Sequence, residues 1–139
     1  MERLRISQVL NTLPSSDKIT VCGWVRTFRN DRFLAVNDGS TIHNIQLVVQ
    51  REDFDESLLK QLTTGAAIRA VGVLVESQGG GQSVEIQVNE LEILGEADPD
   101  EFPIQMKKHS LEFLRDKAHL RFRTNTFSAV FRIRHLLQF

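Results

Sequence analysis

GWVRTFRNDRFLAVNDGSTIHNIQLVV, residues 23–49, is the stretch that decides the fold of this chain. It predicts a strand through Val25, a turn at Asn30-Asp31, a second strand from Phe33 to Val36, a strong turn over 37–40 and a third strand over 42–50. Apolar and polar side chains alternate in the third strand, so one face of it should be buried. Three strands joined by short turns indicate a small β-structure.

The residues on either side complete this architecture. Ser7 is predicted to cap a short helix ending at Leu10, and a helix capped by Asp53 is predicted over 53–62. Two further strands are expected over 67–75 and 84–94, with a glycine hairpin tip at 79–81 between them. Three strands, a helix and two strands are the order of the five-stranded antiparallel Greek-key barrel called the OB-fold.

The chain divides into three predicted parts. The OB-fold occupies residues 1–96, an acidic, proline-containing linker covers 97–109, and a helical segment covers 110–139. The second helix of that segment should start near Thr124 or Asn125 and run to Phe139. It is apolar on more than one face, so it should pack against something else. We expect the chain to be part of a longer protein whose helix is cut short.

Composition limits the class of protein. The chain has 139 residues, 41% hydrophobic and 25% charged, as is ordinary for a globular domain. It contains neither a secretory signal nor a run of about 20 apolar residues that would cross a membrane. Its single cysteine, Cys22, is expected to be a buried small hydrophobe, and a cytoplasmic protein with no membrane partner is expected.

Charge is distributed unevenly along the chain. The net charge of −1 combines −7 over residues 1–102 with +6 over residues 103–139. An acidic barrel is a poor general binder of phosphate backbones, so nucleic-acid binding would depend on a local basic cluster. Arg26, Arg29 and Arg32 supply one, although a solvated hairpin edge is an alternative interpretation of the same residues.

The sequence assembles no catalytic site. Four scattered histidines lack metal-ligand spacing, and neither a nucleophile elbow nor a phosphate loop is present. We therefore predict no metal, no bound cofactor and no catalytic residue in these 139 residues. An OB-fold surface favours single-stranded nucleic acid instead, because aromatic rings stack on bases and arginines contact phosphates. Phe33 offers such a ring unless it belongs to the core, and the Gln46 amide suits a uracil edge.

Several segments resemble the barrel of asparaginyl-tRNA synthetase, within the class II synthetases for Asp, Asn and Lys. They are CGWV from Cys22, FLAVNDGS from Phe33, NIQLVV from Asn44, RAVGVLVES from Arg69 and EIQVNELEIL from Glu85. HSLEFLR from His109 and HLRFRTNTFSAVFRIRH from His119 are similar to the entry into that family's catalytic domain, including the start of its motif 1. RTNTF favours the asparaginyl member over the aspartyl one.

The resemblance implies roles for single residues. Arg29 falls where the family has an arginine facing the anticodon loop, and Phe33 where a ring stacks on the middle anticodon base, a uridine. Gln46 falls where a side chain bonds that uridine, and Glu85 is similar in place to a carboxylate near the third base. With Arg26, these form the predicted nucleic-acid-binding set.

Two positions depart from the family pattern, and part of the family's machinery is missing. Val48 stands where aspartyl relatives have a second aromatic, and Phe122 stands where a turn former such as proline is usual. Motifs 2 and 3, which hold ATP and the adenylate in this family, are absent. The resemblance implies a parent that joins asparagine to tRNA with ATP and magnesium as a homodimer. This part would recognise the anticodon and be inactive alone.

Two other functions fit parts of the sequence. One is a free-standing tRNA-binding module or synthetase paralogue without catalysis. The other is a non-specific single-strand binder, which the acidic barrel disfavours. Sequence beyond residue 139 would separate the first from the synthetase interpretation.

Overall fold

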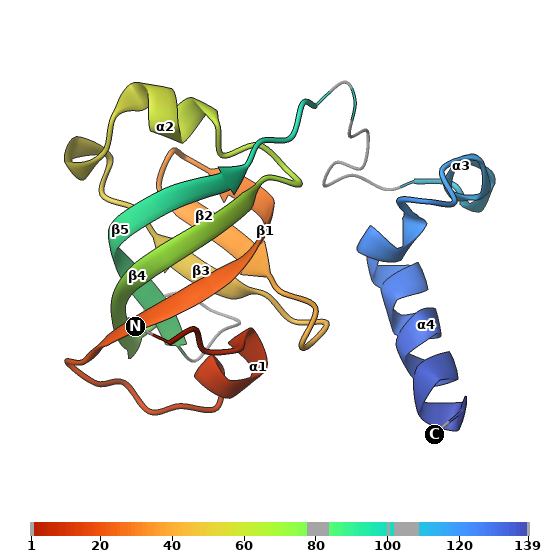
Figure 1. The fold of residues 1–139 in the computed structure, drawn as a ribbon, viewed down its shortest axis with the longest axis horizontal. Coiled ribbons are helices and arrows are strands. Elements are labelled where there is room, and N and C mark those ends of the chain that lie inside the picture. Colours follow the sequence, from red (N-terminus) through yellow and green to blue (C-terminus); the bar gives the residue numbers. More distant parts are fainter. Residues whose placement is uncertain (1, 78–83, 100, 102–108, 139) are drawn as a thin grey trace.

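Five strands form a closed barrel in the computed structural model, which describes residues 2–77, 84–99, 101 and 109–138 (Figure 1). The strands are β1 (Lys18–Arg29), β2 (Phe33–Asn37), β3 (Ile45–Val48), β4 (Ala67–Glu76) and β5 (Val84–Gly95). Their order around the barrel is β1-β2-β3-β5-β4. The predicted OB-fold is therefore confirmed.

One pair of strands differs from a purely antiparallel sheet. β3 and β5 run parallel, with Gln46 beside Glu85, whereas the other four pairs are antiparallel. The reason is topological: β3 is antiparallel to β2, β5 is antiparallel to β4, and both β2 and β4 oppose β1. Closing the barrel between β3 and β5 therefore joins two strands of the same direction.

The core fills the barrel and extends to short helices at its two ends (Figure 1). Ile45, Leu47 and Val49 are buried, as their alternation predicts. A Cβ at Gly23 would lie 2.6 Å from Val36 Cγ1, and one at Gly72 would overlap the carbonyl oxygen of Gln87. Both positions therefore require glycine, because the neighbouring strand approaches too closely for a side chain.

The short helix α1 (Ile6–Val9) starts one residue before the predicted cap, Ser7. Its first N–H groups are bound from the β2–β3 loop instead: Ile6 N donates to Asp38 Oδ2 at 2.9 Å, and Ser7 N donates to Ser40 Oγ at 3.0 Å. A long-range contact thus satisfies donors that a local cap would otherwise satisfy.

The predicted helix over 53–62 is wrong in extent. The segment forms a 3₁₀ turn, η1 (Arg51–Asp53), followed by α2 (Glu56–Lys60) with Asp55 at its N-cap position. Phe54 has extended backbone angles and packs its ring against the core, which interrupts the helix.

The prediction that Cys22 is buried is also wrong. Cys22 is half-buried, because it follows the inward-facing Val21 and so lies on the outer side of β1.

The C-terminal segment lies beside the barrel and consists of α3 (Leu111–Asp116), η2 (Arg121–Arg123) and α4 (Asn125–Gln138) (Figure 1). Ser110 Oγ caps α3 by accepting a hydrogen bond from Phe113 N at 3.1 Å. In α4 no described residue is buried, and Leu137 is 82% exposed. The predicted glycine tip at 79–81 and most of the predicted linker lie outside the described residues.

Candidate nucleic-acid interface

Two rows of side chains run across the outer face of β1, β2, β3 and β5. Strand register defines them, because the residues between them point into the core. One row is Arg29, Phe33, Val48 and Gln87, and the other is Thr27, Ala35, Gln46 and Glu85. Four of the five residues predicted to bind nucleic acid, Arg29, Phe33, Gln46 and Glu85, therefore share one face.

Phe33 lies on this outer face and not in the hydrophobic core. Its ring is half-buried, and the Arg32 guanidinium carbon lies 5.4 Å from its centroid. Such a cation–π contact places a positive charge beside an aromatic ring, the pair of features with which single-strand binders hold nucleic acid. The alternative of a core Phe33 does not agree with this placement.

The turn before Phe33 places two arginines at the edge of the face. Asn30 and Asp31 both have positive φ, 56° and 52°, as a type I′ turn requires. Arg32 N donates to Arg29 O at 3.0 Å and closes the turn. Arg29 and Arg32 are both exposed there, so their guanidinium groups are accessible to phosphates.

Gln46 and Glu85 form a hydrogen-bonded pair in the second row. Gln46 Nε2 donates to Glu85 Oε2 at 2.8 Å. Glu85 is only 8% exposed, whereas Gln46 is half-buried. Val48, between Phe33 and Gln87, is 4% exposed and offers no ring, which agrees with the departure noted from the sequence.

Arg26 does not join this face. A register shift between Val25 and Thr27 marks a β-bulge, which turns Arg26 toward the C-terminal segment. Its Nη1 donates to Arg123 O at 2.8 Å and its Nη2 donates to Asn125 Oδ1 at 3.2 Å. Burial, and secondly the nearby Arg123, lower the pKa of Arg26.

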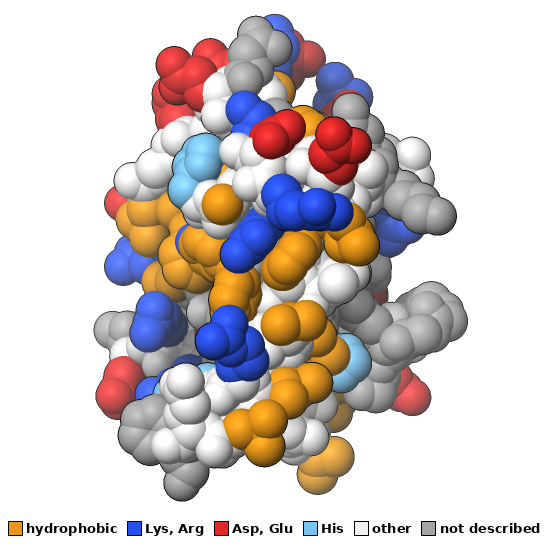
Figure 2. Space-filling view, turned by 90° about the vertical axis from the view of Figure 1, so that its right-hand side faces the viewer, with side chains coloured by type: hydrophobic (Ala, Val, Ile, Leu, Met, Phe, Trp, Pro, Cys, Tyr) orange, Lys and Arg blue, Asp and Glu red, His pale blue; other side chains and the backbone are white. Residues whose placement is uncertain are grey.

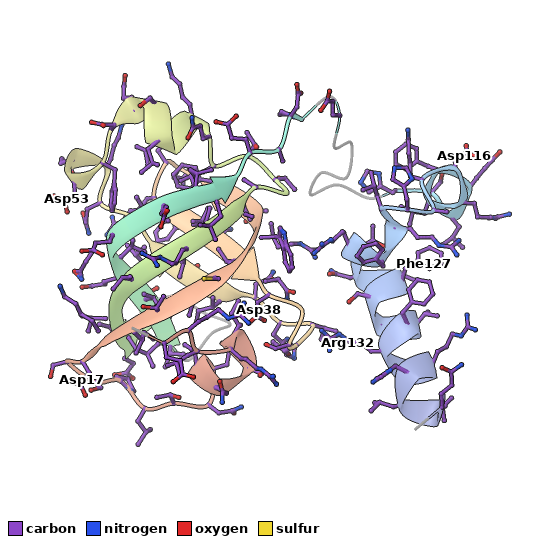
Figure 3. All side chains as sticks on the ribbon, in the orientation of Figure 1. Asp17, Asp38, Asp53, Asp116, Phe127 and Arg132 are labelled. Atoms are coloured by element: carbon purple, nitrogen blue, oxygen red, sulfur yellow. The ribbon has the colours of Figure 1, made fainter. Side chains whose placement is uncertain are left out.

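A cleft of about 1330 Å³ separates the barrel from the C-terminal segment. Arg123 spans it, with its guanidinium carbon 4.1 Å from the centroid of the Trp24 ring. Arg132 reaches from α4 to the loop that carries Asp38 and donates to Gly39 O (Figure 3). The outward face of the segment carries basic side chains among apolar ones (Figure 2).

Sequence reasoning missed Trp24, Arg123 and Arg132 as residues that join the two regions. For Trp24 the alternation of side chains along β1 was an available signal. Val25 is apolar and faces inward, so its neighbour Trp24 should lie on the outer side of the strand. No pattern in the sequence indicated Arg123 or Arg132, because contacts between the segment and the barrel join residues about a hundred positions apart.

Neither a metal site nor a membrane span is found in the described part of the chain. No three His, Cys, Asp or Glu side chains gather there as metal ligands. None of its helices combines the length and apolar character needed to cross a bilayer.

The fold and its basic, aromatic outer face define a nucleic-acid-binding OB-fold, and comparison with known proteins agrees. Residues 19–94 match the tRNA anticodon family of OB-fold nucleic acid binding domains, and the chain belongs to this family.

Two relatives of high sequence identity are asparagine–tRNA ligases. The chain is 54% identical over 138 residues to the asparagine–tRNA ligase of Porphyromonas gingivalis, covering 97% of this chain and 29% of that protein. It is 50% identical to that of Cytophaga hutchinsonii, with 100% and 31% covered. The resemblance to asparaginyl-tRNA synthetase is thus confirmed, whereas the start of motif 1 within it stays a prediction. The chain spans under a third of these relatives' length.

The fold likeness extends beyond the barrel. The crystal structure of asparaginyl-tRNA synthetase from Pyrococcus horikoshii superposes with a TM-score of 0.76 at 22% identity, over 96% of this chain and 33% of that one. Coverage this wide includes the C-terminal segment.

Proposed function

We propose that this chain recognises the anticodon of asparagine tRNA as part of an asparagine–tRNA ligase. The observation that carries the proposal is the convergence of Arg29, Phe33 and the Gln46–Glu85 pair on one barrel face. The middle anticodon base, a uridine, stacks on Phe33 while the Gln46 amide bonds its Watson–Crick edge. Arg29 and Arg32 contact the adjoining phosphates.

The remaining steps of the parent reaction belong to parts outside these residues. A ligase of this class needs ATP and magnesium, and the described residues contain no cluster of carboxylates or histidines that fits the metal. We propose that ATP, magnesium and asparagine bind elsewhere in the parent. The parent is proposed to be a cytoplasmic homodimer. Its barrel ends near residue 96, its catalytic domain begins near residue 110, and the linker lies between them.

The test is binding of RNA hairpins that carry the asparagine anticodon loop. Phe33→Ala should weaken binding by about 1–3 kcal/mol, because one base loses its stacking partner. Binding is measured by fluorescence anisotropy, with the melting temperature from circular dichroism recorded for each variant. Phe113→Ala, a half-buried ring on α3, is the matched control and should leave the affinity unchanged.

Two results would contradict the proposal. Equal affinity for the anticodon hairpin and for a hairpin of scrambled loop would indicate a non-specific single-strand binder. Unchanged affinity of a folded Phe33→Ala variant would remove the stacking role.

A further inference from the structure

The buried carboxylate of Glu85 has an outward-facing polar neighbour. It lies beside Gln46 in the parallel register of β3 and β5 and accepts a hydrogen bond of 2.8 Å from Gln46 Nε2. Because Glu85 is 8% exposed and Gln46 is half-buried, the amide is the more accessible of the two groups on the binding face.

This contact controls the orientation of the amide. An ionised carboxylate only accepts hydrogen bonds, so the Gln46 side chain must direct Nε2, and never Oε1, toward Glu85. The Oε1 atom and the second hydrogen on Nε2 then remain for a ligand. A glutamine without this neighbour would be able to rotate its amide by half a turn at little cost.

The orientation matters because uracil and cytosine present opposite patterns of hydrogen-bond donors and acceptors on the same edge. Uracil offers an N3–H donor and an O4 acceptor, whereas cytosine offers an N3 acceptor and an N4 amino donor. A freely rotating amide pairs with either base by turning over. An amide held in one orientation, beside a base fixed by Phe33, pairs with uracil and opposes cytosine with two facing acceptors.

We infer that Glu85 is a positioning residue that makes Gln46 selective for uridine over cytidine, an inference that rests on the proposed function. Glu85 itself need not touch the RNA. Its effect on base choice passes through Gln46, in contrast to a carboxylate that contacts the third anticodon base directly.

The experiment compares three hairpins with the 139-residue chain: the asparagine anticodon loop, the same loop with its middle uridine changed to cytidine, and the same loop with its third base changed. Two variants remove the contact differently. Glu85→Gln removes the charge and admits both amide orientations, while Glu85→Asp keeps the charge but shortens the side chain. Glu90→Gln, an exposed position on β5, is the control for charge.

Both Glu85 variants should reduce the uridine-to-cytidine affinity ratio by about tenfold, the effect of one well-placed hydrogen bond. Glu90→Gln should keep the ratio. In a Gln46→Ala background, Glu85→Gln should change the ratio no further. Relaxation of the Gln46 side-chain amide measured by NMR without RNA should show a rigid group in the parent and a mobile one in both variants.

An unchanged middle-base ratio in either folded Glu85 variant would overturn the inference, as would an equal loss in the Gln46→Ala background. A change confined to the third-base ratio would also overturn it and assign Glu85 a direct contact. These results can be told apart from failure of the proposed function. In that case the unsubstituted 139-residue chain itself would not prefer the asparagine hairpin.

Discussion

The barrel and the C-terminal segment are each stabilised by a different kind of interaction. Barrel side chains such as Leu47 are fully buried in a continuous apolar core, whereas no described residue of α4 is buried. Arginines make hydrogen bonds and a cation–π contact between the segment and the barrel: Arg26, Arg123 and Arg132. Regions with few buried apolar contacts open at lower free energy than a packed core. The barrel should therefore be the more stable unit.

The largest expected difference comes from truncating an apolar side chain in each region. Leu47→Ala should destabilise the barrel by about 2–5 kcal/mol, because it leaves a cavity in a closed core. Leu137→Ala, at an exposed site on α4, should change stability by less than about 0.5 kcal/mol. Urea unfolding followed by far-ultraviolet circular dichroism measures both. Similar effects at the two positions would contradict the contrast between the regions.

A smaller effect is expected where the two regions meet. Arg26→Ala removes two hydrogen bonds to the C-terminal segment, so amide hydrogen exchange over residues 121–138 should accelerate by about tenfold. Exchange in β1 to β5 should stay nearly constant. Arg29→Ala, three residues away but exposed on the binding face, serves as the control: it should lower RNA affinity without affecting that exchange. Faster exchange throughout the barrel in Arg26→Ala would show that the two regions unfold together.

The smallest effect tests the attachment of α1 to the barrel. Burial alone would raise the pKa of Asp38, but hydrogen bonds from Ser40 and from Ile6 N, with the charge of Arg3, outweigh it and lower the pKa. A lowered folded-state pKa means stability that is present above the unfolded value of about 3.9 and is lost as pH falls through the folded value. Asp38→Ala should cost about 1 kcal/mol at neutral pH.

That cost should begin to shrink below about pH 4, where the unfolded chain takes up the proton, and should vanish as pH falls through the lowered pKa of Asp38, where the folded parent also loses the carboxylate. Urea unfolding of both chains from pH 7 to pH 3 checks this, with Asp17→Ala, an exposed aspartate, as the control. A cost that stays constant through this range would assign the effect to packing and not to charge.

Local alternation explains which parts of the fold and site were predictable. A strand repeats every two residues, so burying Ile45, Leu47 and Val49 necessarily places Gln46 on the outer face. For Phe33 the sequence left a core position open, and the burial of its neighbour Leu34 in the structure places it outside. The prediction for Gln46 needs only neighbours in sequence, and the structure agrees with it.

What sequence could not supply depends on contacts between distant residues. Gln46 and Glu85 are 39 positions apart, and only closure of the barrel pairs them. Arg26 and Arg29 look alike in the sequence, but the β-bulge after Val25 directs Arg26 to the segment while Arg29 stays at the binding face. The α1 cap from Asp38 likewise lies 32 residues from its target.

The position of Trp24 makes it a natural optical probe. The chain has one tryptophan and no tyrosine, so nearly all of its intrinsic emission arises from this ring. The indole is 37% exposed and lies under the Arg123 guanidinium at the boundary of the two regions. Its fluorescence therefore senses separation of the segment from the barrel, whereas circular dichroism senses loss of secondary structure. Recording both signals on one sample would distinguish separation of the segment from unfolding of the chain, without an added label.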